Sequence, residues 1–328
     1  MDFWPIERGE QAFQQSVTAD GIQAVCRRAF GPDALVVSAE ELGSGMYNSV
    51  YRVRLAGRDC PVVLRVAPEE RRQFRSERHL MRNEFACQPW LVPIAHLMPR
   101  VIAADWTGQV IGRDWMIQTH LDGVPAPEHL GSYPWDTWPG FFRQLGEIAR
   151  AVHAVRGPRF GPVAGPGYMT WSEAVLASLE EIAADLDGSG LDSADVRQAA
   201  AAAGRERAVL DEVTEPRLLT GDLWTVNCLL DLAGAEPVIT GVLDFDRAWF
   251  GAPDADWTIR MATARNDERT AFWESYGTRD RSPAARWRSR IYEARHLGAL
   301  RLERHRLGKA DAVAESYPAM AAVLAGLT

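Results

Sequence analysis

The chain of 328 residues contains a single lysine, Lys309, so arginine supplies all its other long basic side chains. A catalytic or binding site built from other parts of the chain therefore cannot use a lysine. Cysteines are also few: Cys26, Cys60, Cys87 and Cys228 are scattered, without the paired spacing of a zinc site. We therefore expect buried, reduced thiols and no structural zinc.

Long apolar runs are missing as well. No segment approaches the roughly 18 consecutive apolar residues that a membrane span needs. The first eight residues include acidic side chains and lack the apolar stretch of a secretory signal. The net charge of −8 disfavours nucleic acid, whose phosphates select basic surfaces. We therefore expect a cytoplasmic protein that binds neither membranes nor nucleic acid, and its charge is compatible with a cationic ligand.

Short segments of alternating apolar and polar residues dominate the first 122 residues, and this pattern is typical of half-buried strands. A helical lead-in is predicted over 1–35 and a charged helix over 69–88. The predicted strands cover the end of 43–55 and residues 61–67, 98–104 and 113–121. Glycine and prolines at 122–127 break regular structure. We place the domain boundary there, with an N-terminal lobe over 1–122 and a C-terminal lobe over 123–328.

The C-terminal lobe is predicted to be mostly helical, because its apolar residues recur at helical spacing. The predicted helices cover 138–155, 171–186, 194–213 and 286–307. A single β segment, over 217–220, 227–231 and 238–243, interrupts them and has acidic residues at its edges. A strand-rich lobe followed by a helical lobe is a two-lobed α+β plan.

Three polar residues stand at the edges of that β segment. Asp222 and Asn227 have the spacing of a kinase catalytic loop, and Asp244 follows an apolar strand. Phosphoryl transfer needs a carboxylate that accepts or orients the proton of the attacking hydroxyl, and oxygen ligands for Mg²⁺. An isolated Asp or Asn at a turn more often caps backbone groups. The three residues in this order instead predict a phosphoryl-transfer site.

The segments GDLWTVN at 221–227, LDFD at 243–246 and GAPDAD at 251–256 resemble the signature of the aminoglycoside phosphotransferases and related small-molecule kinases. The resemblance implies a bilobal, protein-kinase-like fold. Its N-terminal lobe would hold an antiparallel sheet and one helix. Its larger, mainly helical C-terminal lobe would hold the catalytic hairpin and the acceptor site.

The resemblance also implies a role for each residue of the hairpin. Asp222 would be the catalytic base, or the group that orients the hydroxyl. Asn227 and Asp244 would bind Mg²⁺. Asp246 and Asp256 match positions that more often brace the catalytic loop than perform chemistry.

A glycine-rich turn between two predicted strands resembles the nucleotide loop of this family. It contains Gly43, Ser44, Gly45 and Asn48. Backbone N–H groups in such a loop approach phosphate oxygens.

Arg65 stands on the next predicted strand, where kinases carry a lysine that pairs with nucleotide phosphates and with a helix glutamate. Arginine keeps the positive charge and offers a bidentate fork to phosphate, although it is bulkier. We expect its glutamate partner to be Glu84, and Glu77 remains open.

The end of the strand at 113–121 matches the hinge of the family, at 118–123. Backbone groups from Gln118 to His120 would hydrogen-bond the purine of ATP or GTP.

Two positions depart from the family pattern. Thr220 stands where relatives carry a histidine that ties the catalytic loop to the fold, and Ala252 stands where they carry an aspartate. We expect these changes to affect the rigidity of the loop more than the class of reaction. Outside the motif, we expect His153 to satisfy a buried hydrogen bond and the arginine-rich segment 295–306 to form a solvated helix face.

These features together predict a kinase that uses ATP or GTP with Mg²⁺. It would transfer the γ-phosphoryl group to a hydroxyl of a small molecule, such as an antibiotic or another secondary metabolite. A protein that binds nucleotide or metabolite without phosphorylating it remains the alternative, and Arg65 and Thr220 motivate it.

Overall fold

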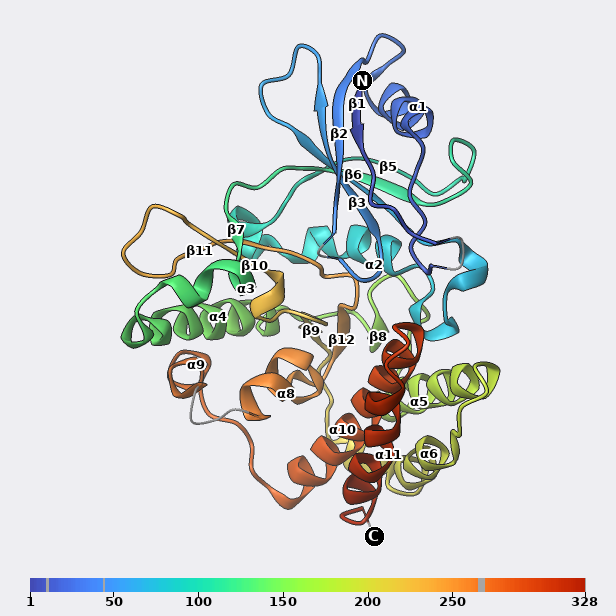
Figure 1. Cartoon of the computed structure of the whole chain (residues 1–328). Coiled ribbons are helices and arrows are strands. Elements are labelled where there is room, and N and C mark those ends of the chain that lie inside the picture. The colour runs from blue at the N-terminus through green and yellow to red at the C-terminus, as the bar shows by residue number, and fades with distance from the viewer. Residues whose placement is uncertain (10–11, 44, 265–268, 328) are drawn as a thin grey trace. The chain divides into compact units, whose positions relative to one another are not determined.

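The computed structural model describes residues 1–9, 12–43, 45–264 and 269–327 (Figure 1). The chain forms two compact units. The first contains Met1–Gln73 and Leu97–Asp122, and the second contains Phe74–His96 and Gly123–Thr328. The sequence predicts one boundary at residue 122, whereas in the structure the segment 74–96 groups with the second unit.

The first unit is built on one six-stranded sheet and the helix α1, Ala19–Phe30. Its strands are β1 Asp2–Trp4, β2 Val36–Leu42, β3 Ser49–Leu55, β4 Val62–Val66, β5 Val101–Asp105 and β6 Trp115–Thr119. Their order in the sheet is β1-β2-β3-β4-β6-β5. Only the β1–β2 pair is parallel in this sheet, and the other neighbours are antiparallel.

Alternation along β3 fixes which face of this sheet is buried. Tyr51, Val53 and Leu55 are buried and join the core that contains Ile22 and Val25 of α1. Burying each such side chain contributes about 1.5–3 kcal/mol. The hydroxyl of Thr18 caps α1 by accepting the N–H of Gly21.

The second unit is mainly helical. Its helices are α2 Leu80–Cys87, α3 Ala126–His129, α4 Trp138–His153, α5 Trp171–Gly188, α6 Ala194–Arg205, α7 Arg207–Asp211, α8 Trp257–Ala264, α9 Thr270–Tyr276, α10 Pro283–Arg306 and α11 Ala310–Leu324. Its strands are β7 Val124–Pro125, β8 Gly161–Pro162, β9 Arg217–Leu219, β10 Cys228–Leu230, β11 Ile239–Val242 and β12 Trp249–Gly251. They form two three-stranded sheets, in the orders β11-β10-β7 and β8-β12-β9.

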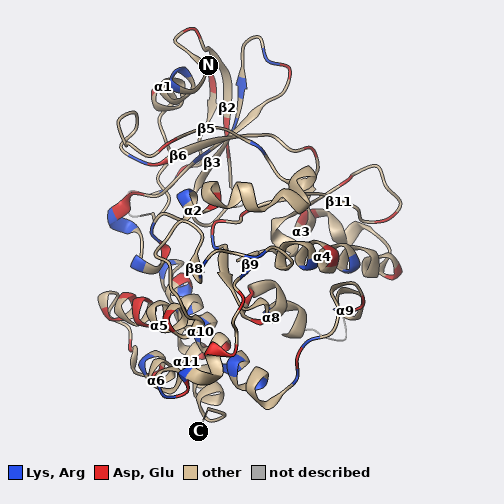
Figure 2. Cartoon of the chain, turned by 180° about the vertical axis from the view of Figure 1, so that it is seen from behind, with Lys and Arg blue, Asp and Glu red and all other residues tan. Residues whose placement is uncertain are grey.

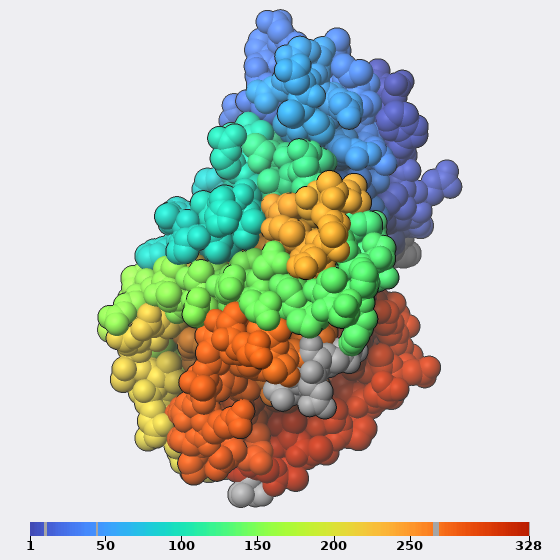
Figure 3. Space-filling view, turned by 90° about the vertical axis from the view of Figure 1, so that its left-hand side faces the viewer, coloured from blue at the N-terminus to red at the C-terminus, as the bar shows by residue number. Residues whose placement is uncertain are grey.

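Close helix packing supports these small sheets. A Cβ at Gly146 of α4 would lie 2.4 Å from the carbonyl oxygen of Phe272, so only glycine lets α9 approach this closely (Figures 1 and 3). On another side, α5 and α10 share a core in which the indole N–H of Trp171 donates to the Tyr292 hydroxyl over 2.7 Å. Among the described residues, no helix is long and apolar enough to cross a membrane.

Two predicted helices are wrong in extent. The lead-in at 1–35 contains β1 and an irregular stretch before α1. The segment 69–88 forms two 3₁₀ turns and then the short helix α2. Extended backbone at Phe74 and Arg78 and the left-handed φ of His79, 62°, interrupt the predicted helix. Helical spacing of apolar residues does not reveal such breaks.

Candidate active site

The β10–β11 hairpin brings two of the predicted site residues together. Its strands are antiparallel, with Cys228 opposite Val242. One step further along, the N–H of Leu243 donates to the carbonyl oxygen of Asn227 over 2.9 Å. Asn227 precedes one strand and Asp244 follows the other, so the antiparallel pairing places the two residues at the same end of the hairpin.

Asp222 begins the loop that leads into this hairpin. The side-chain amide of Asn227 donates to the carbonyl oxygen of Asp222 over 2.8 Å. The backbone N–H of Asn227 donates to the carbonyl of Trp224 over 2.9 Å. The N–H₂ end of the Asn227 amide therefore closes the loop, and its oxygen is the end suited to a cation.

The backbone of Asp244 has an uncommon conformation, with φ +67°. Aspartate is one of the few residues other than glycine that tolerates the left-handed region. Such conformations cluster at functional sites, where the surrounding structure enforces them.

The carboxyl of Asp222 has a raised pKa, close to neutral pH. Burial raises its pKa to about 7; the guanidinium of Arg247 opposes this shift, and the nearby carboxylates of Asp244, Glu303 and Asp256 add to it. A carboxyl with a pKa close to working pH is suited to accept a proton.

Asp256 fixes the backbone that leads into Asp222. One carboxylate oxygen, Oδ2, accepts the N–H of Thr220 over 2.7 Å and its hydroxyl over 2.8 Å. The other, Oδ1, accepts the N–H of Gly221 over 3.0 Å. This is the bracing contact that the sequence predicts for Asp256.

A histidine from α4 completes this brace. Nε2 of His153 lies 2.7 Å from Oδ2 of Asp256, and its Nδ1 lies 2.8 Å from the hydroxyl of Tyr276. The prediction that His153 makes a buried hydrogen bond is confirmed. The chain thus has an imidazole on the bracing carboxylate even though position 220 is threonine.

Replacing Thr220 with valine removes one donor from this buried carboxylate, and we expect a loss of about 1–3 kcal/mol in the free energy of unfolding. Burial alone would raise the pKa of Asp256, but hydrogen bonds from His153 and Thr220 hold it below its usual value. The stability that Asp256 contributes is therefore present above about pH 4 and is lost as the pH falls through its folded pKa. Thr220→Val should make this acid loss begin at higher pH.

Urea unfolding measured from pH 7 down to pH 3 checks this prediction. Thr137→Val is the matched control, because that hydroxyl makes a solvent-exposed bond to the carbonyl of Pro134. Equal losses in the two variants, with the same pH profile, would contradict the bracing role of Thr220.

Gly221 permits a close approach between two segments of the backbone. Its φ is +82°. A Cβ there would lie 2.3 Å from the carbonyl carbon of Arg247 and 2.7 Å from the nitrogen of Ala248. Both the conformation and the space require glycine, so the loop that contains Asp222 lies directly on the segment that follows Asp244.

Two arginines share one buried glutamate beside this segment. Nη2 of Arg247 donates to Glu77 over 2.9 Å, and Arg306 at the end of α10 pairs with the other oxygen of the same carboxylate. Burial alone would raise the pKa of Glu77, but the two guanidinium groups hold it below its usual value. Glu77 therefore locks the positive charge of Arg247 in place near Asp222.

The prediction of a solvated face at 295–306 is wrong. The side chain of Arg301 is fully buried and bonds twice to Asp195, over 2.9 and 2.6 Å. Arg295 donates to the Ser178 hydroxyl over 2.7 Å, and its guanidinium carbon lies 4.6 Å from the ring centroid of Trp249. These arginines pack α10 into the second unit.

The hairpin end fits a hard cation. Within the described residues, no group of three or more His, Cys, Asp or Glu side chains could hold a metal ion. Asp244 and Asn227 would offer a carboxylate and an amide oxygen, and Mg²⁺ prefers oxygen ligands while keeping waters and substrate phosphates in its other positions. The donor set suits Mg²⁺ bound together with a nucleotide.

The predicted nucleotide loop lies in the first unit, and Ser44 falls outside the described residues. A Cβ at Gly43 would lie 3.0 Å from a methyl carbon of Ile6, whereas one at Gly45 would meet only ordinary contacts. Asn48 is buried, and its side-chain oxygen has no hydrogen-bond partner among the described residues. A buried polar atom without a partner is costly, so a ligand or water is expected there.

Three of the four other predicted nucleotide residues are buried, and the fourth is partly exposed. In the first unit, Arg65 on β4 is 8% exposed and Gln118 on β6 is 3% exposed, and His120 follows β6 and is partly exposed. In the second unit, Glu84 on α2 is 1% exposed. The pairing of Arg65 with Glu84, or with Glu77, stays a prediction.

Some residues of the site are not evident from the sequence. Arg247 directly follows the LDFD segment, so its position next to the motif was an available signal. Nothing in the sequence marks Glu77 or Arg306 as its neighbours, because they lie 170 residues before it and 59 residues after it.

Comparison with known proteins identifies the family and the fold. A profile of the phosphotransferase enzyme family, APH, matches residues 38–290. The chain therefore belongs to this family. No curated protein matches significantly.

Solved structures of aminoglycoside phosphotransferases have the same fold. The chain is similar to the aminoglycoside phosphotransferase APH(4)-Ia, with a TM-score of 0.64, 19% identity, and coverage of 94% of this chain and 99% of that chain. It is also similar to the GDP complex of wild-type aminoglycoside 2'-phosphotransferase-IIIa, with a TM-score of 0.62, 19% identity, and coverage of 95% and 100%.

A third similar structure is a thermostable APH(4)-Ia mutant in a ternary complex with AMP-PNP and hygromycin B, with a TM-score of 0.63, 18% identity, and coverage of 94% and 99%. The predicted α+β, protein-kinase-like fold class is confirmed.

Proposed function

We propose that this phosphotransferase moves the γ-phosphoryl group of ATP or GTP to a hydroxyl of a small molecule, and that Asp222 is its catalytic base. The observation that carries the proposal is the meeting of three groups. Asp222 has a pKa near 7 and is bonded through its carbonyl to Asn227, and Asn227 shares a hairpin end with Asp244.

In this proposal, each residue of the hairpin has one task. The Asp222 carboxylate accepts or orients the proton of the attacking hydroxyl, which strengthens the oxygen as a nucleophile. Asn227 and Asp244 would hold Mg²⁺, which supplies charge neutralisation for the phosphates when it is bound. The brace of Asp256 and His153 keeps Asp222 fixed during the reaction, because the backbone of Thr220 and Gly221 cannot shift without breaking its bonds.

Arg247 would set the charge balance at the base. It lowers the pKa of Asp222 against the effect of burial, and Glu77 holds it in position. Without this cation the base would stay protonated to higher pH. Arg247 is therefore assigned as a positioning and electrostatic residue rather than a catalytic one.

The nucleotide residues are proposed on the family resemblance together with burial. Gly43, Gly45 and Asn48 would approach the phosphates, and Arg65 would pair with them. Gln118 and His120, at the end of β6, would offer backbone groups to the purine. The similar structures contain GDP, AMP-PNP or ADP, so they leave both ATP and GTP as donors for this chain.

The acceptor is proposed to be a hydroxylated antibiotic or another secondary metabolite. Similar structures contain hygromycin B or kanamycin. In this chain, acidic residues line the exposed side of α5, which is marked red in Figure 2, and Glu303 lies near Asp222. Negative charge there favours a cationic acceptor, because opposite charges attract over the range of the Debye length.

The alternative is a kinase-like protein that binds nucleotide or metabolite without phosphorylating it. Thr220 is one of the two residues that support this alternative. Its support is weakened by the hydrogen bonds of Thr220 and His153 to Asp256, because they brace the loop without the usual histidine. Arg65 is the second residue that supports the alternative. This support is also weakened, because arginine keeps the positive charge of the lysine that it replaces.

Calorimetric titration with ATP and with GTP, each with and without Mg²⁺, tests the first half of the proposal. We expect binding that strengthens when Mg²⁺ is present. A thermal-shift screen of hydroxylated antibiotics with the bound nucleotide then selects acceptors for turnover assays. Binding of nucleotide or of a metabolite without turnover would favour the alternative. No nucleotide binding would refute the proposed phosphotransferase.

A further inference from the structure

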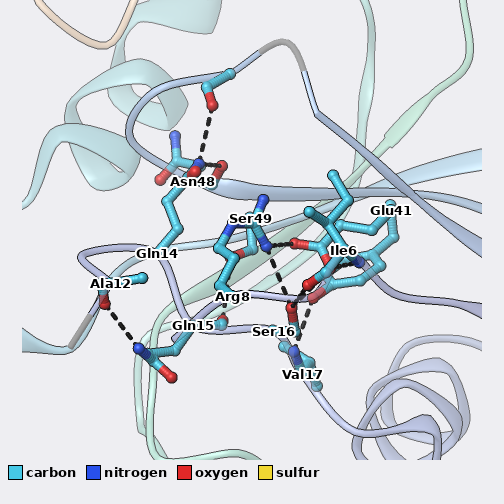
Figure 4. Close-up of polar contacts among 12 residues, drawn as sticks. Ile6, Arg8, Ala12, Gln14, Gln15, Ser16, Val17, Glu41, Asn48 and Ser49 are labelled. Carbon is cyan, nitrogen blue, oxygen red and sulfur yellow. Dashed lines mark hydrogen bonds and ion pairs between the residues drawn. The ribbon is translucent and has the colours of Figure 1, made fainter. Parts of the chain in front are cut away.

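Gln14 contacts the predicted nucleotide loop from outside it. Its side-chain Nε2 donates to two loop carbonyls, those of Gly45 over 3.0 Å and Asn48 over 2.8 Å (Figure 4). Both acceptors and the donor belong to the first unit. One amide group therefore bridges the two ends of the turn that leads into β3.

Neighbours of Gln14 add further contacts to the same loop. The ring of Phe13 packs against the ring of Tyr47, with centroids 5.3 Å apart. The hydroxyl of Ser49 donates to the carbonyl of Gln15 over 3.1 Å (Figure 4). The segment 12–17 thus lies along residues 45–49.

This segment is itself firmly anchored. The buried carboxylate of Glu41 accepts the N–H of Ile6 over 3.0 Å and the hydroxyl of Ser16 over 2.7 Å, and it pairs with Arg8 (Figure 4). The N–H of Val17 donates to the Tyr51 hydroxyl over 2.7 Å. Gln14 can therefore act as a fixed support.

The two bonds of Gln14 determine where loop N–H groups point. In a trans peptide the carbonyl and the next N–H point in opposite directions. Holding the carbonyl of Gly45 toward Gln14 therefore turns the N–H of Met46 away from it. Among the residues that the structure describes, none accepts a hydrogen bond from that N–H.

We propose that Gln14 is a positioning residue for nucleotide binding: by holding the Gly45 and Asn48 carbonyls, it presents the N–H of Met46 to a phosphate oxygen. The proposal rests on the proposed function of the loop and adds a residue from outside the motif. A flexible loop would have to order when the nucleotide binds, and that ordering weakens affinity. The preformed loop avoids this loss.

Gln14→Ala tests the proposal in the full-length protein. Losing two hydrogen bonds should free the loop, and we expect the dissociation constant for Mg²⁺-ATP or Mg²⁺-GTP to rise roughly tenfold. Gln14→Glu should weaken binding further, because a carboxylate would face two carbonyl oxygens. Hydrogen exchange of residues 43–48 without nucleotide should be faster in Gln14→Ala than in the wild type.

Gln23→Ala is the matched control in the same unit. The Gln23 amide also bridges two backbone groups, donating to the carbonyl of Ala34 over 2.7 Å and accepting the N–H of Val36 over 3.1 Å. That variant should lose comparable thermal stability while keeping wild-type nucleotide affinity.

The outcomes separate this proposal from the proposed function. If the wild type binds nucleotide and Gln14→Ala binds it equally well, only the role of Gln14 is refuted. Equal weakening in Gln23→Ala would refute it too, because the effect would then be one of general stability. If the wild type binds no nucleotide, both the proposed function and the role of Gln14 are refuted.

Discussion

Asp222→Asn is expected to lower turnover by about 10²–10⁴-fold while leaving nucleotide affinity unchanged. Asparagine has the shape of aspartate but cannot accept the proton of the attacking hydroxyl. The surrounding loop should persist, because Asn227 bonds to the carbonyl of residue 222 and not to its side chain. Steady-state assays and calorimetry with the same nucleotide separate the two effects.

The same variant should be more stable than the wild type at pH 8. Because burial raises the pKa of Asp222 from the usual 3.8 to about 7, the folded state favours the protonated form. The stability gained from this preference is present below about pH 4 and is lost as the pH rises through 7. Asparagine stays neutral, so the gain in the midpoint of thermal unfolding should shrink as the pH is lowered from 8 to 4.

The pH dependence of the wild type follows from the same group. The base must be ionised, so kcat/KM should rise with pH and level off above an apparent pKa near 7. Asp280→Asn is the control, because Asp280 lies outside α5 and accepts the N–H and the hydroxyl of Ser282 at the surface. It should keep wild-type turnover. Wild-type activity in Asp222→Asn would show that another group activates the hydroxyl.

Gly221→Ala should produce the second large effect. Its φ of +82° is unfavourable for alanine, and the new Cβ would lie 2.3 Å from the carbonyl carbon of Arg247. The strain and the overlap together should cost roughly 2–5 kcal/mol in the free energy of unfolding. Since the loop must move to relieve the overlap, turnover should fall by about 10²-fold or more.

Gly308→Ala measures the cost of placing alanine in the left-handed backbone conformation without a steric overlap. Gly308 has a φ of +69°, and a Cβ there would meet nothing within 4 Å. It should cost only about 1–2 kcal/mol and leave turnover unchanged. Urea unfolding and turnover are measured for both variants. A loss in Gly221→Ala no greater than that in Gly308→Ala would contradict the close contact between residue 221 and Arg247.

The hairpin could be predicted from the sequence because the residues that define it lie close together along the chain. Asp222 and Asn227 stand five positions apart in one loop, and Asp244 follows a short and mostly apolar strand. Antiparallel pairing of two short neighbouring strands then brings Asn227 and Asp244 together. The class of fold followed from the order of strand-rich and helical segments for the same reason.

The electrostatic surroundings of the hairpin could not be predicted in this way. Glu77 reaches Arg247 and Arg306 only through tertiary packing, and the arginine-rich face of α10 looks solvated because charge patterns do not report burial. The contact of Gln14 with Gly45 is also non-local. A glutamine side chain with two backbone acceptors leaves no pattern in the sequence.

The missing family histidine illustrates a related limit. At position 220 the sequence predicts a weaker brace, because threonine offers a single hydroxyl. The structure places His153 of α4 on the same carboxylate of Asp256, 2.7 Å away. A role that depends on a point in space can be filled from another element, and a motif aligned along the chain does not reveal it.

Phosphate transfer itself is the most direct test of the account. The wild type and Asp222→Asn are each incubated with Mg²⁺, with ATP or GTP labelled at the γ-phosphate, and with the acceptor that gives the largest thermal shift. The acceptor is then analysed by mass spectrometry and for incorporated label. We expect a singly phosphorylated acceptor that carries the label with the wild type, and almost none with Asp222→Asn. Bound nucleotide with no phosphorylated acceptor from the wild type, or equal product from the two proteins, would contradict it.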